Sequence, residues 1–275
     1  MKIRICLNKL VSVLKTPVEY YLTHSKYGKV FLNTWLGKSV LLSHTGSIHC
    51  IRCKRETNKS FQQGFCYPCL RRLWECNFCI IRPECCRIEK GECPVDDWAH
   101  AHCHKNHIVY LANSAKLKVG ITQTTQVPTR WIDQGAIQAV PMFQTKNRFQ
   151  AGTIEVVLKS FVADRTDWRR MLQNDIEKLD LISEKNILLK RANFSLSKTI
   201  CQFSRRDIYK FKTTAITQLS YPVLQYPSKI QVLSLEKTPV ISGTLLGIKG
   251  QYLILNTGIF NVRKYCGYNV ECIVL

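Results

Sequence analysis

Residues 107–122, with the sequence HIVYLANSAKLKVGIT, predict the centre of the fold. They contain two short apolar runs of β type, 108–112 and 117–121, separated by the polar residues Asn113 and Ser114. Two such runs joined by turn-forming residues are typical of a β-hairpin. We therefore expect an antiparallel pair of strands here, around which the rest of the chain can be placed.

The residues that follow predict helices with one further strand. Pro128 suits the first turn of a helix and Gly135 suits its end. Apolar side chains then recur at helical spacing along 148–162, where Glu155 borders the apolar stripe. We expect helices at 128–134, 148–162, 167–173 and 175–186, and a strand at 137–143 that joins the hairpin.

Cysteines dominate the segment before the hairpin, because ten of the fourteen lie between positions 50 and 103. Cys50-x-x-Cys53 and Cys66-x-x-Cys69 are two C-x-x-C pairs. Each pair can direct two thiolates at one tetrahedral ion, so the two pairs predict a structural zinc site with a short ribbon hairpin between them. The main alternative is a redox dithiol, which normally uses a single C-x-x-C on a βαβ background.

Further donors follow between positions 76 and 107. Cys79, Cys86, Cys93 and Cys103 have spacings suited to a second closed zinc site, and we predict them as its ligands. The composition leaves other sets open, drawn from Cys76, Cys85, His100, His102, His104 and His107. The first three histidines are also compatible with a solvated turn, whereas His107 adjoins an apolar strand. The remaining cysteines, which we expect to be small core residues, are Cys6, Cys201, Cys266 and Cys272.

Both ends of the chain have β-type patterns. Residues 1–49 contain short apolar runs such as 29–32 and 39–42. Residues 205–275 contain about five, which predict a small barrel-like domain: 229–235, 240–246, 252–255, 259–262 and 269–275. Its aromatic side chains could stack with bases or could form a core.

The net charge of +21 is spread over the whole chain. The excess of basic over acidic residues is +6 in 1–49, +3 in 50–107, +6 in 108–204 and +6 in 205–275. A field of this kind favours a polyanionic partner, most often nucleic acid. The apolar runs are too short to cross a membrane, so we expect a cytoplasmic protein with no membrane partner. No small-molecule cofactor is evident, and the oligomeric state is left open.

Several motifs between Cys50 and the C-terminal region are specific when taken together. They are CxxC…GxCxPC, PExC, HxVYLANS, KVGIT, PTRWIDQGA, AGxxE, DxTxWRxML and GTLLGIKGQYLIL…NVRKYCGY. This string resembles an uncharacterised bacterial family of domains of unknown function. The order VY, KVGIT, Arg and Glu also resembles the GIY-YIG endonuclease superfamily, with matches at Val109-Tyr110, Val119-Gly120, Arg130 and Glu155.

The nuclease resemblance implies roles for four residues. Tyr110 would deprotonate or position the attacking water, Arg130 would bind the phosphate, and Glu155 would hold Mg²⁺ or Mn²⁺. Lys118 stands where the superfamily has the tyrosine of its second motif. A lysine can contact phosphate, but it is a different acid–base group. Trp131, Asp133 and Gln134 follow Arg130 and could build a pocket.

These observations predict an α+β fold of four parts. The parts are an N-terminal β segment (1–49), a zinc-ribbon-like region (50–106), a GIY-YIG-like sheet flanked by helices (107–204) and a β-rich C-terminal domain (205–275). We expect a zinc-containing protein that binds DNA or RNA. Metal-dependent hydrolysis of phosphodiesters, non-catalytic binding by a degenerate nuclease core, and a zinc-stabilised scaffold for protein interactions remain open.

Overall fold

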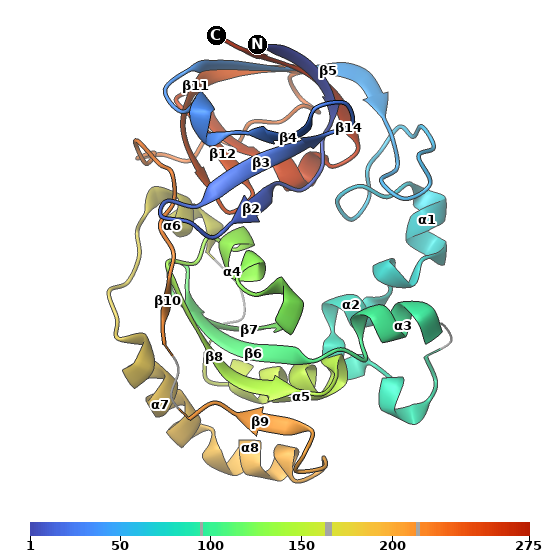
Figure 1. Cartoon of the computed structure of the whole chain (residues 1–275), viewed down its shortest axis with the longest axis vertical. Coiled ribbons are helices and arrows are strands. Elements are labelled where there is room, and N and C mark those ends of the chain that lie inside the picture. Colours follow the sequence, from blue (N-terminus) through green and yellow to red (C-terminus); the bar gives the residue numbers. More distant parts are fainter. Residues whose placement is uncertain (94–95, 163–166, 213–214) are drawn as a thin grey trace.

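The computed structural model of the chain describes residues 1–93, 96–162, 167–212 and 215–275. Figure 1 shows two lobes stacked along the longest axis, with the cysteine-rich segment at one side. The terminal lobe holds the strands of residues 2–48 and 240–274, and the central lobe holds those of residues 107–218. The sheets are antiparallel and helices accompany them, so the predicted α+β class is confirmed.

A six-stranded antiparallel sheet of the terminal lobe pairs the two ends of the chain, and the Met1 amino group donates to the Val274 carbonyl oxygen at 2.6 Å. The strand order β1–β14–β5–β11–β12–β13 has two free ends, so the described strands form no closed barrel. The predicted C-terminal barrel is therefore wrong, because its strands pair with β1 and β5 instead of closing on themselves. The strands are β1 (Lys2–Cys6), β5 (Ser39–Ile48), β11 (Val240–Lys249), β12 (Tyr252–Leu255), β13 (Gly258–Asn261) and β14 (Tyr268–Val274).

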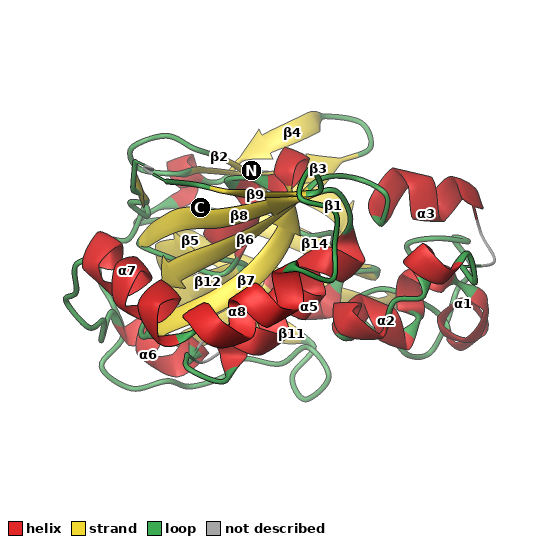
Figure 2. Ribbon diagram, turned by 90° about the horizontal axis from the view of Figure 1, so that it is seen from below, coloured by secondary structure: helices red, strands yellow, loops and turns green. Residues whose placement is uncertain are grey.

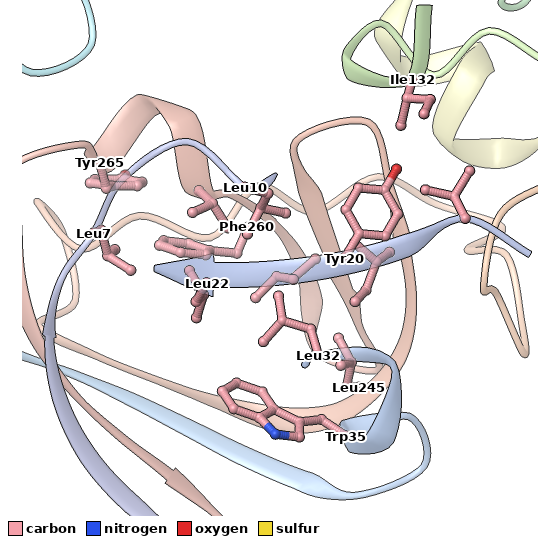
Figure 3. Packing of buried hydrophobic residues seen from close by; sticks show 14 of the residues in the cluster. Leu7, Leu10, Tyr20, Leu22, Leu32, Trp35, Ile132, Leu245, Phe260 and Tyr265 are labelled. Carbon is pink, nitrogen blue, oxygen red and sulfur yellow. The ribbon is translucent and has the colours of Figure 1, made fainter. Parts of the chain in front are cut away.

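A three-stranded sheet shares its core with the six-stranded sheet. It consists of β2 (Val11–Val13), β3 (Glu19–His24) and β4 (Gly28–Phe31). Burial alternates along β3, where Tyr20 and Leu22 point inward. Figure 3 shows Leu22 among the core side chains and the ring of Tyr20 directed towards Ile132 of the central lobe. The two lobes therefore share one apolar cluster.

The sheet of the central lobe has the order β10–β8–β6–β7, with β9 paired to β8. Every residue of β6 is buried. Val109 and Leu111 pack towards the helices, whereas Tyr110 and Ala112 pack towards the terminal lobe, and this burial on both faces explains the continuous apolar run. The strands are β6 (His107–Asn113), β7 (Leu117–Gln123), β8 (Gln138–Thr145), β9 (Ile208–Lys210) and β10 (Thr217–Gln218).

Helices cover both faces of this sheet. Figure 2 shows α5, α7 and α8 along one face, where α5 buries Ala151, Ile154 and Leu158. Asn147 caps α5 by accepting the backbone N–H of Gln150 at 2.9 Å. On the other face, α4 lies near β2 of the terminal lobe. The helices are α4 (Thr129–Asp133), α5 (Arg148–Lys159), α6 (Trp168–Gln173), α7 (Leu181–Arg191) and α8 (Asn193–Ile200).

The cysteine-rich segment contains short helices and turns. The helices are α1 (Tyr67–Arg72), α2 (Phe78–Ile81) and α3 (Asp96–His102). The predicted ribbon between the C-x-x-C pairs is reduced to one antiparallel bridge between Phe61 and Phe65. In the ranges that the structure describes, no helix combines the length and apolar character needed to cross a bilayer.

The elements predicted around the hairpin agree with the structure, but three other expectations are wrong. The helix expected at 175–186 begins at Leu181, because the Asp180 side chain caps it by accepting the Ile182 N–H at 3.0 Å. The run 229–235 forms a single bridge, from Val232 to Ile259, instead of a strand. Cys201 is exposed, although Cys266 and Cys272 are core residues as expected. Positions 164–166 of the DxTxWRxML motif lie outside the described residues.

Candidate functional site

The clearest candidate for a metal site is the cluster of Cys50, Cys53, Cys66 and Cys69. Their four Sγ atoms lie within 4.8 Å of one another, and those of Cys53 and Cys66 are 3.7 Å apart. Ligand sulfurs about 2.3 Å from a tetrahedral zinc ion lie about 3.8 Å from each other. The cluster therefore has the dimensions of the predicted first zinc site and could hold such an ion.

Two tight turns direct these thiols to one point. The Lys54 N–H donates to the Cys50 carbonyl at 3.0 Å, and the Leu70 N–H donates to the Cys66 carbonyl at 2.9 Å. Burial raises the pKa of the Cys50 thiol, but neighbouring backbone N–H groups outweigh burial and lower that pKa to about 6. Donors directed at a sulfur stabilise the thiolate, which is the form that binds zinc.

The second predicted ligand set lies in one apolar cluster. Cys86 and Cys103 are buried there, and Cys79 and Cys93 pack against them. A hydrogen bond from the Cys103 thiol lowers the pKa of Cys86 to about 6. Within the described part of the chain, however, only the first set has its ligand atoms within 4.8 Å of one another. The second set is thus brought together, but more loosely.

The histidines that the sequence left open have different environments. His100, His102 and His104 are exposed; His100 stacks on His104, and His102 stacks on Trp98. His107 is buried, and its Nδ1 lies 2.7 Å from a backbone carbonyl oxygen. Among the described groups, its Nε2 has no hydrogen-bond partner. Burial lowers the pKa of His107 to about 4, so its ring is neutral at pH 7.

The second cysteine segment is held against the start of α5. An Arg148 guanidinium nitrogen donates to the Ile80 carbonyl at 2.6 Å, and the Arg148 backbone N–H donates to the Cys103 carbonyl at 2.9 Å. The Glu89 carboxylate accepts the Gln150 side-chain N–H at 2.9 Å. These contacts attach the segment to the helix that carries Glu155.

Gly152 allows this helix to approach the segment closely. A Cβ atom at Gly152 would lie 2.7 Å from the Pro83 side chain and 2.8 Å from the Glu84 backbone nitrogen. Such distances are too short for a methyl group, so only glycine fits without displacing the segment.

Arg130 and Glu155 both lie close enough to Tyr110 for their charges to act on its hydroxyl. Burial raises the pKa of Tyr110 to about 12; the charge of Arg130 opposes this rise and the charge of Glu155 adds to it. Tyr110 is fully buried, and its hydroxyl donates to Gln134 Oε1 at 2.7 Å. Gly120 is its register partner on β7. The predicted residues are therefore gathered around a tyrosine that solvent does not reach.

The donors around Glu155 are a poor fit for the predicted catalytic divalent ion. Glu155 is buried, and its Oε2 lies 3.5 Å from Lys159 Nζ. Lys118 is also buried. Magnesium in proteins is usually held by one or two carboxylates together with water and substrate phosphates. Among the described residues, Glu155 belongs to no cluster of metal-binding groups, so these side chains do not fit such an ion.

The residues beside Arg130 connect the lobes instead of lining a pocket. Trp131 packs edge-on against Tyr110, with ring centroids 5.8 Å apart. Asp133 accepts the Gln251 side-chain N–H at 2.8 Å and forms an ion pair with Lys9. The sequence analysis missed Lys9 and Gln251, because each is far from Asp133 along the chain and neither belongs to a local pattern.

A basic cavity of about 530 Å³ lies at the other side of the central sheet, and the sequence analysis missed it as well. Lys185, Lys190, Lys210 and Lys212 contribute to its lining, together with two asparagines and no acidic residue. These lysines come from α7 and from β9 and its end, so only the folded chain places them together.

Comparison with known proteins identifies one family to which the chain is similar. No curated protein and no solved structure matches the chain. A family described as a protein of unknown function, DUF2797, matches residues 37–270, which include both cysteine sets, the central lobe and strands β5, β11, β12 and β13 of the terminal lobe. This match covers most of the sequence, and the chain therefore belongs to the DUF2797 family.

Proposed function

We propose that this protein binds nucleic acid through the phosphate backbone and that its nuclease-like core is not catalytic. The observation that carries the proposal is the state of Arg130. Its side chain is half-buried beside Tyr110, and it is ion-paired with no carboxylate in the described part of the chain. A half-buried guanidinium without a carboxylate partner, on a chain of net charge +21, is suited to bind a phosphate group.

The charge around the central lobe supports a polyanionic partner. The cavity lined by Lys185, Lys190, Lys210 and Lys212 adds further positive charge to this lobe. Phosphate groups repeat along a nucleic acid, so a chain with separate basic surfaces can neutralise several of them at once. A scaffold for protein interactions would not need so large a positive charge.

The geometry around Tyr110 supports binding over hydrolysis. A tyrosine that activates water must reach it, but Tyr110 is fully buried and its O–H donates a hydrogen bond to Gln134 Oε1. Its raised pKa opposes loss of the proton at pH 7. Lys118 replaces the second tyrosine of the nuclease motif, and Glu155 already has Lys159 as an ionic partner.

We assign zinc a structural role in this function. One ion would be held by Cys50, Cys53, Cys66 and Cys69. A second would draw together the looser set of Cys79, Cys86, Cys93 and Cys103. Because that set packs at the start of α5, the second ion would stabilise the helix that carries Glu155 against the cysteine segment.

Binding is tested with the zinc-loaded full chain and labelled DNA and RNA oligonucleotides over a series of salt concentrations. We expect affinity to fall steeply as salt rises, and Arg130→Gln to weaken binding about tenfold. Arg4→Gln is the matched control, because it removes the same charge from an exposed side chain that pairs with Glu271. Absence of binding at low salt would refute the proposal.

Catalysis is tested separately, on supercoiled plasmid and structured RNA with Mg²⁺ or Mn²⁺. We expect no cleavage by the wild-type protein. Cleavage by wild type that is lost in identically prepared Glu155→Ala protein would overturn the non-catalytic part of the proposal and establish a nuclease. Equal cleavage by both proteins would indicate a contaminant.

A further inference from the structure

A second arginine, Arg263 of the terminal lobe, lies close enough to Arg130 for the two charges to act on each other. We propose that Arg130 and Arg263 together bind a single phosphodiester group of the nucleic-acid backbone, one guanidinium from each lobe. This inference rests on the proposed function and adds to it a residue that belongs to none of the nuclease motifs.

The fold brings these residues together through a short chain of contacts. Arg263 lies in the 3₁₀ turn Val262–Tyr265, directly after β13. The Val262 N–H donates to the Gln251 carbonyl at 3.0 Å, and the Gln251 side chain donates to Asp133 at 2.8 Å. Asp133 is three residues after Arg130 on α4, so both project from the same side of that helix. The two arginines therefore approach each other where the lobes meet.

Gly250 makes this approach possible. Its φ is +63°, in the left-handed region that favours glycine, and a Cβ there would lie 3.0 Å from the Asp133 carbonyl oxygen. The turn between β11 and β12 is thus pressed against the end of α4. Gln251 and the 3₁₀ turn with Arg263 are carried to α4 by this contact.

The charges at this point are unbalanced. Asp133 is the nearby carboxylate, but it is buried and already engaged by Lys9 and Gln251. Neither Arg130 nor Arg263 is ion-paired with a carboxylate among the described residues. Burial lowers the pKa of Arg263, and the positive charge of Arg130 lowers it further. Two cations held together in this way repel, and a bound anion would relieve that repulsion.

A phosphodiester matches the two side chains in shape and charge. Each guanidinium presents parallel N–H groups that suit two phosphate oxygens, so two of them can hold one phosphate from opposite sides. Both side chains are partly exposed, which leaves the anion access from solvent. A phosphate bound by one arginine from each lobe would also stabilise the contact between the lobes.

The test is a double-mutant cycle with Arg130→Gln, Arg263→Gln and the double variant, all zinc-loaded and compared with Arg4→Gln. Binding of a labelled single-stranded oligonucleotide is measured over a series of salt concentrations. We expect each single variant to weaken binding about tenfold, and the double variant to lose less than the product of the two. Since one phosphate is shared, the number of counterions released on binding, read from the slope of log affinity against log salt concentration, should fall by about one in the double variant. It should fall by less in each single variant.

Several outcomes would overturn the inference. If Arg263→Gln binds as tightly as wild type while Arg130→Gln binds more weakly, Arg263 is not part of the site. The proposed function would then still stand. If the two substitutions reduce affinity independently, and the double variant releases about two fewer counterions on binding, the two arginines bind two separate phosphates. If Arg263→Gln does not fold, Arg263→Lys replaces it; this variant keeps the charge but loses the fork, and it should still bind more weakly than wild type.

Inorganic phosphate serves as a second probe and separates the two proposals. We expect phosphate to raise the melting temperature of wild type more than that of the double variant, with chloride at equal ionic strength as reference. Phosphate stabilisation that depends on both arginines, without any nucleic-acid binding, would refute the proposed function and retain the anion site. Equal stabilisation of wild type and double variant would refute the site.

Discussion

A Cβ atom on Gly120 would lie 2.6 Å from the hydroxyl oxygen of Tyr110 and 2.7 Å from its ring carbon Cζ. The two residues face each other in register on β7 and β6. The glycine is therefore required by the tyrosine, because its missing side chain provides the space in which the buried ring lies.

Gly120→Ala tests this relationship. We expect it to lower the free energy of unfolding by about 1–3 kcal/mol, because a methyl group would overpack the interior. Thermal and denaturant unfolding measure the change. Tyr110→Phe should not rescue the variant, since the contact with Cζ remains. Unchanged stability in Gly120→Ala would show that the ring can move aside.

Tyr110→Phe separates a structural from a catalytic role for this tyrosine. The substitution removes the hydrogen bonds of the hydroxyl with Gln134 and Arg130, so we expect a loss of about 1–2 kcal/mol in stability. Affinity for nucleic acid should fall by less than it does in Arg130→Gln, because the hydroxyl helps to orient Arg130 but touches no ligand. A large loss of affinity in a protein of near-normal stability would place the hydroxyl in contact with the bound molecule.

Cys50→Ser tests the first zinc site. We expect the variant to lose about one zinc ion per chain, and to unfold at lower temperature, because binding of a structural ion stabilises the folded state. Metal analysis of the purified protein provides the measurement. Cys201→Ser is the matched control, since Cys201 is exposed and remote from both cysteine sets along the sequence. Equal zinc content in the two variants would contradict the assignment.

Gly152→Ala tests the attachment of the second cysteine segment to α5. An added methyl group would overlap Pro83 and the Glu84 backbone, so we expect a cost of about 1–3 kcal/mol. Hydrogen exchange should increase in residues 76–93 and 96–103 more than in β6 to β8. An increase spread evenly over the protein would argue against a local detachment.

Lys249 predicts a dependence of stability on alkaline pH. Burial lowers its pKa from 10.5 to about 8, so above pH 8 the unfolded chain holds this proton more tightly than the folded chain. Stability therefore rises with pH between about 8 and 10.5 as this penalty disappears. We expect Lys249→Met to be about 2 kcal/mol more stable than wild type at pH 7, and this advantage to shrink near pH 10.

Denaturant unfolding at several pH values checks this expectation, with the exposed Lys237→Met as control. Lys249 Nζ donates to Asn174 Oδ1 at 3.3 Å and lies 5.1 Å from the ring centre of Tyr226. If these contacts outweigh the cost of burying the charge, Lys249→Met will be less stable than wild type at pH 7.

The sequence was informative where the deciding interactions are local. The hairpin of β6 and β7 follows from two apolar runs with a short polar turn, and the first cysteine cluster follows from two C-x-x-C pairs. Arg130 and Glu155, which the motif order singled out, lie near Tyr110 in the fold, and their roles stay a prediction. The residues that determine the hairpin and the cysteine cluster are close together in the sequence, so their spacing alone predicts these features.

Features that depend on distant partners could not be read from any pattern. The strands of residues 240–274 look able to close on one another, but β11 and β14 pair with β5 instead. Asp133 resembles a pocket residue until Lys9 and Gln251 are seen to occupy its carboxylate. Arg263 has no distinctive neighbours in sequence, and its position beside Arg130 exists only after both lobes have formed.

The place of β14 in its sheet also sets the order in which the lobes can form. β14 lies between β1 and β5, so these two strands have no direct pairing to hold them before residues 268–274 have been synthesised. Pairings between residues so far apart are slow to form. During translation, the central sheet can therefore assemble while β1 and β5 still lack the strands that pair with them, which leaves their edges open to chaperones and to aggregation.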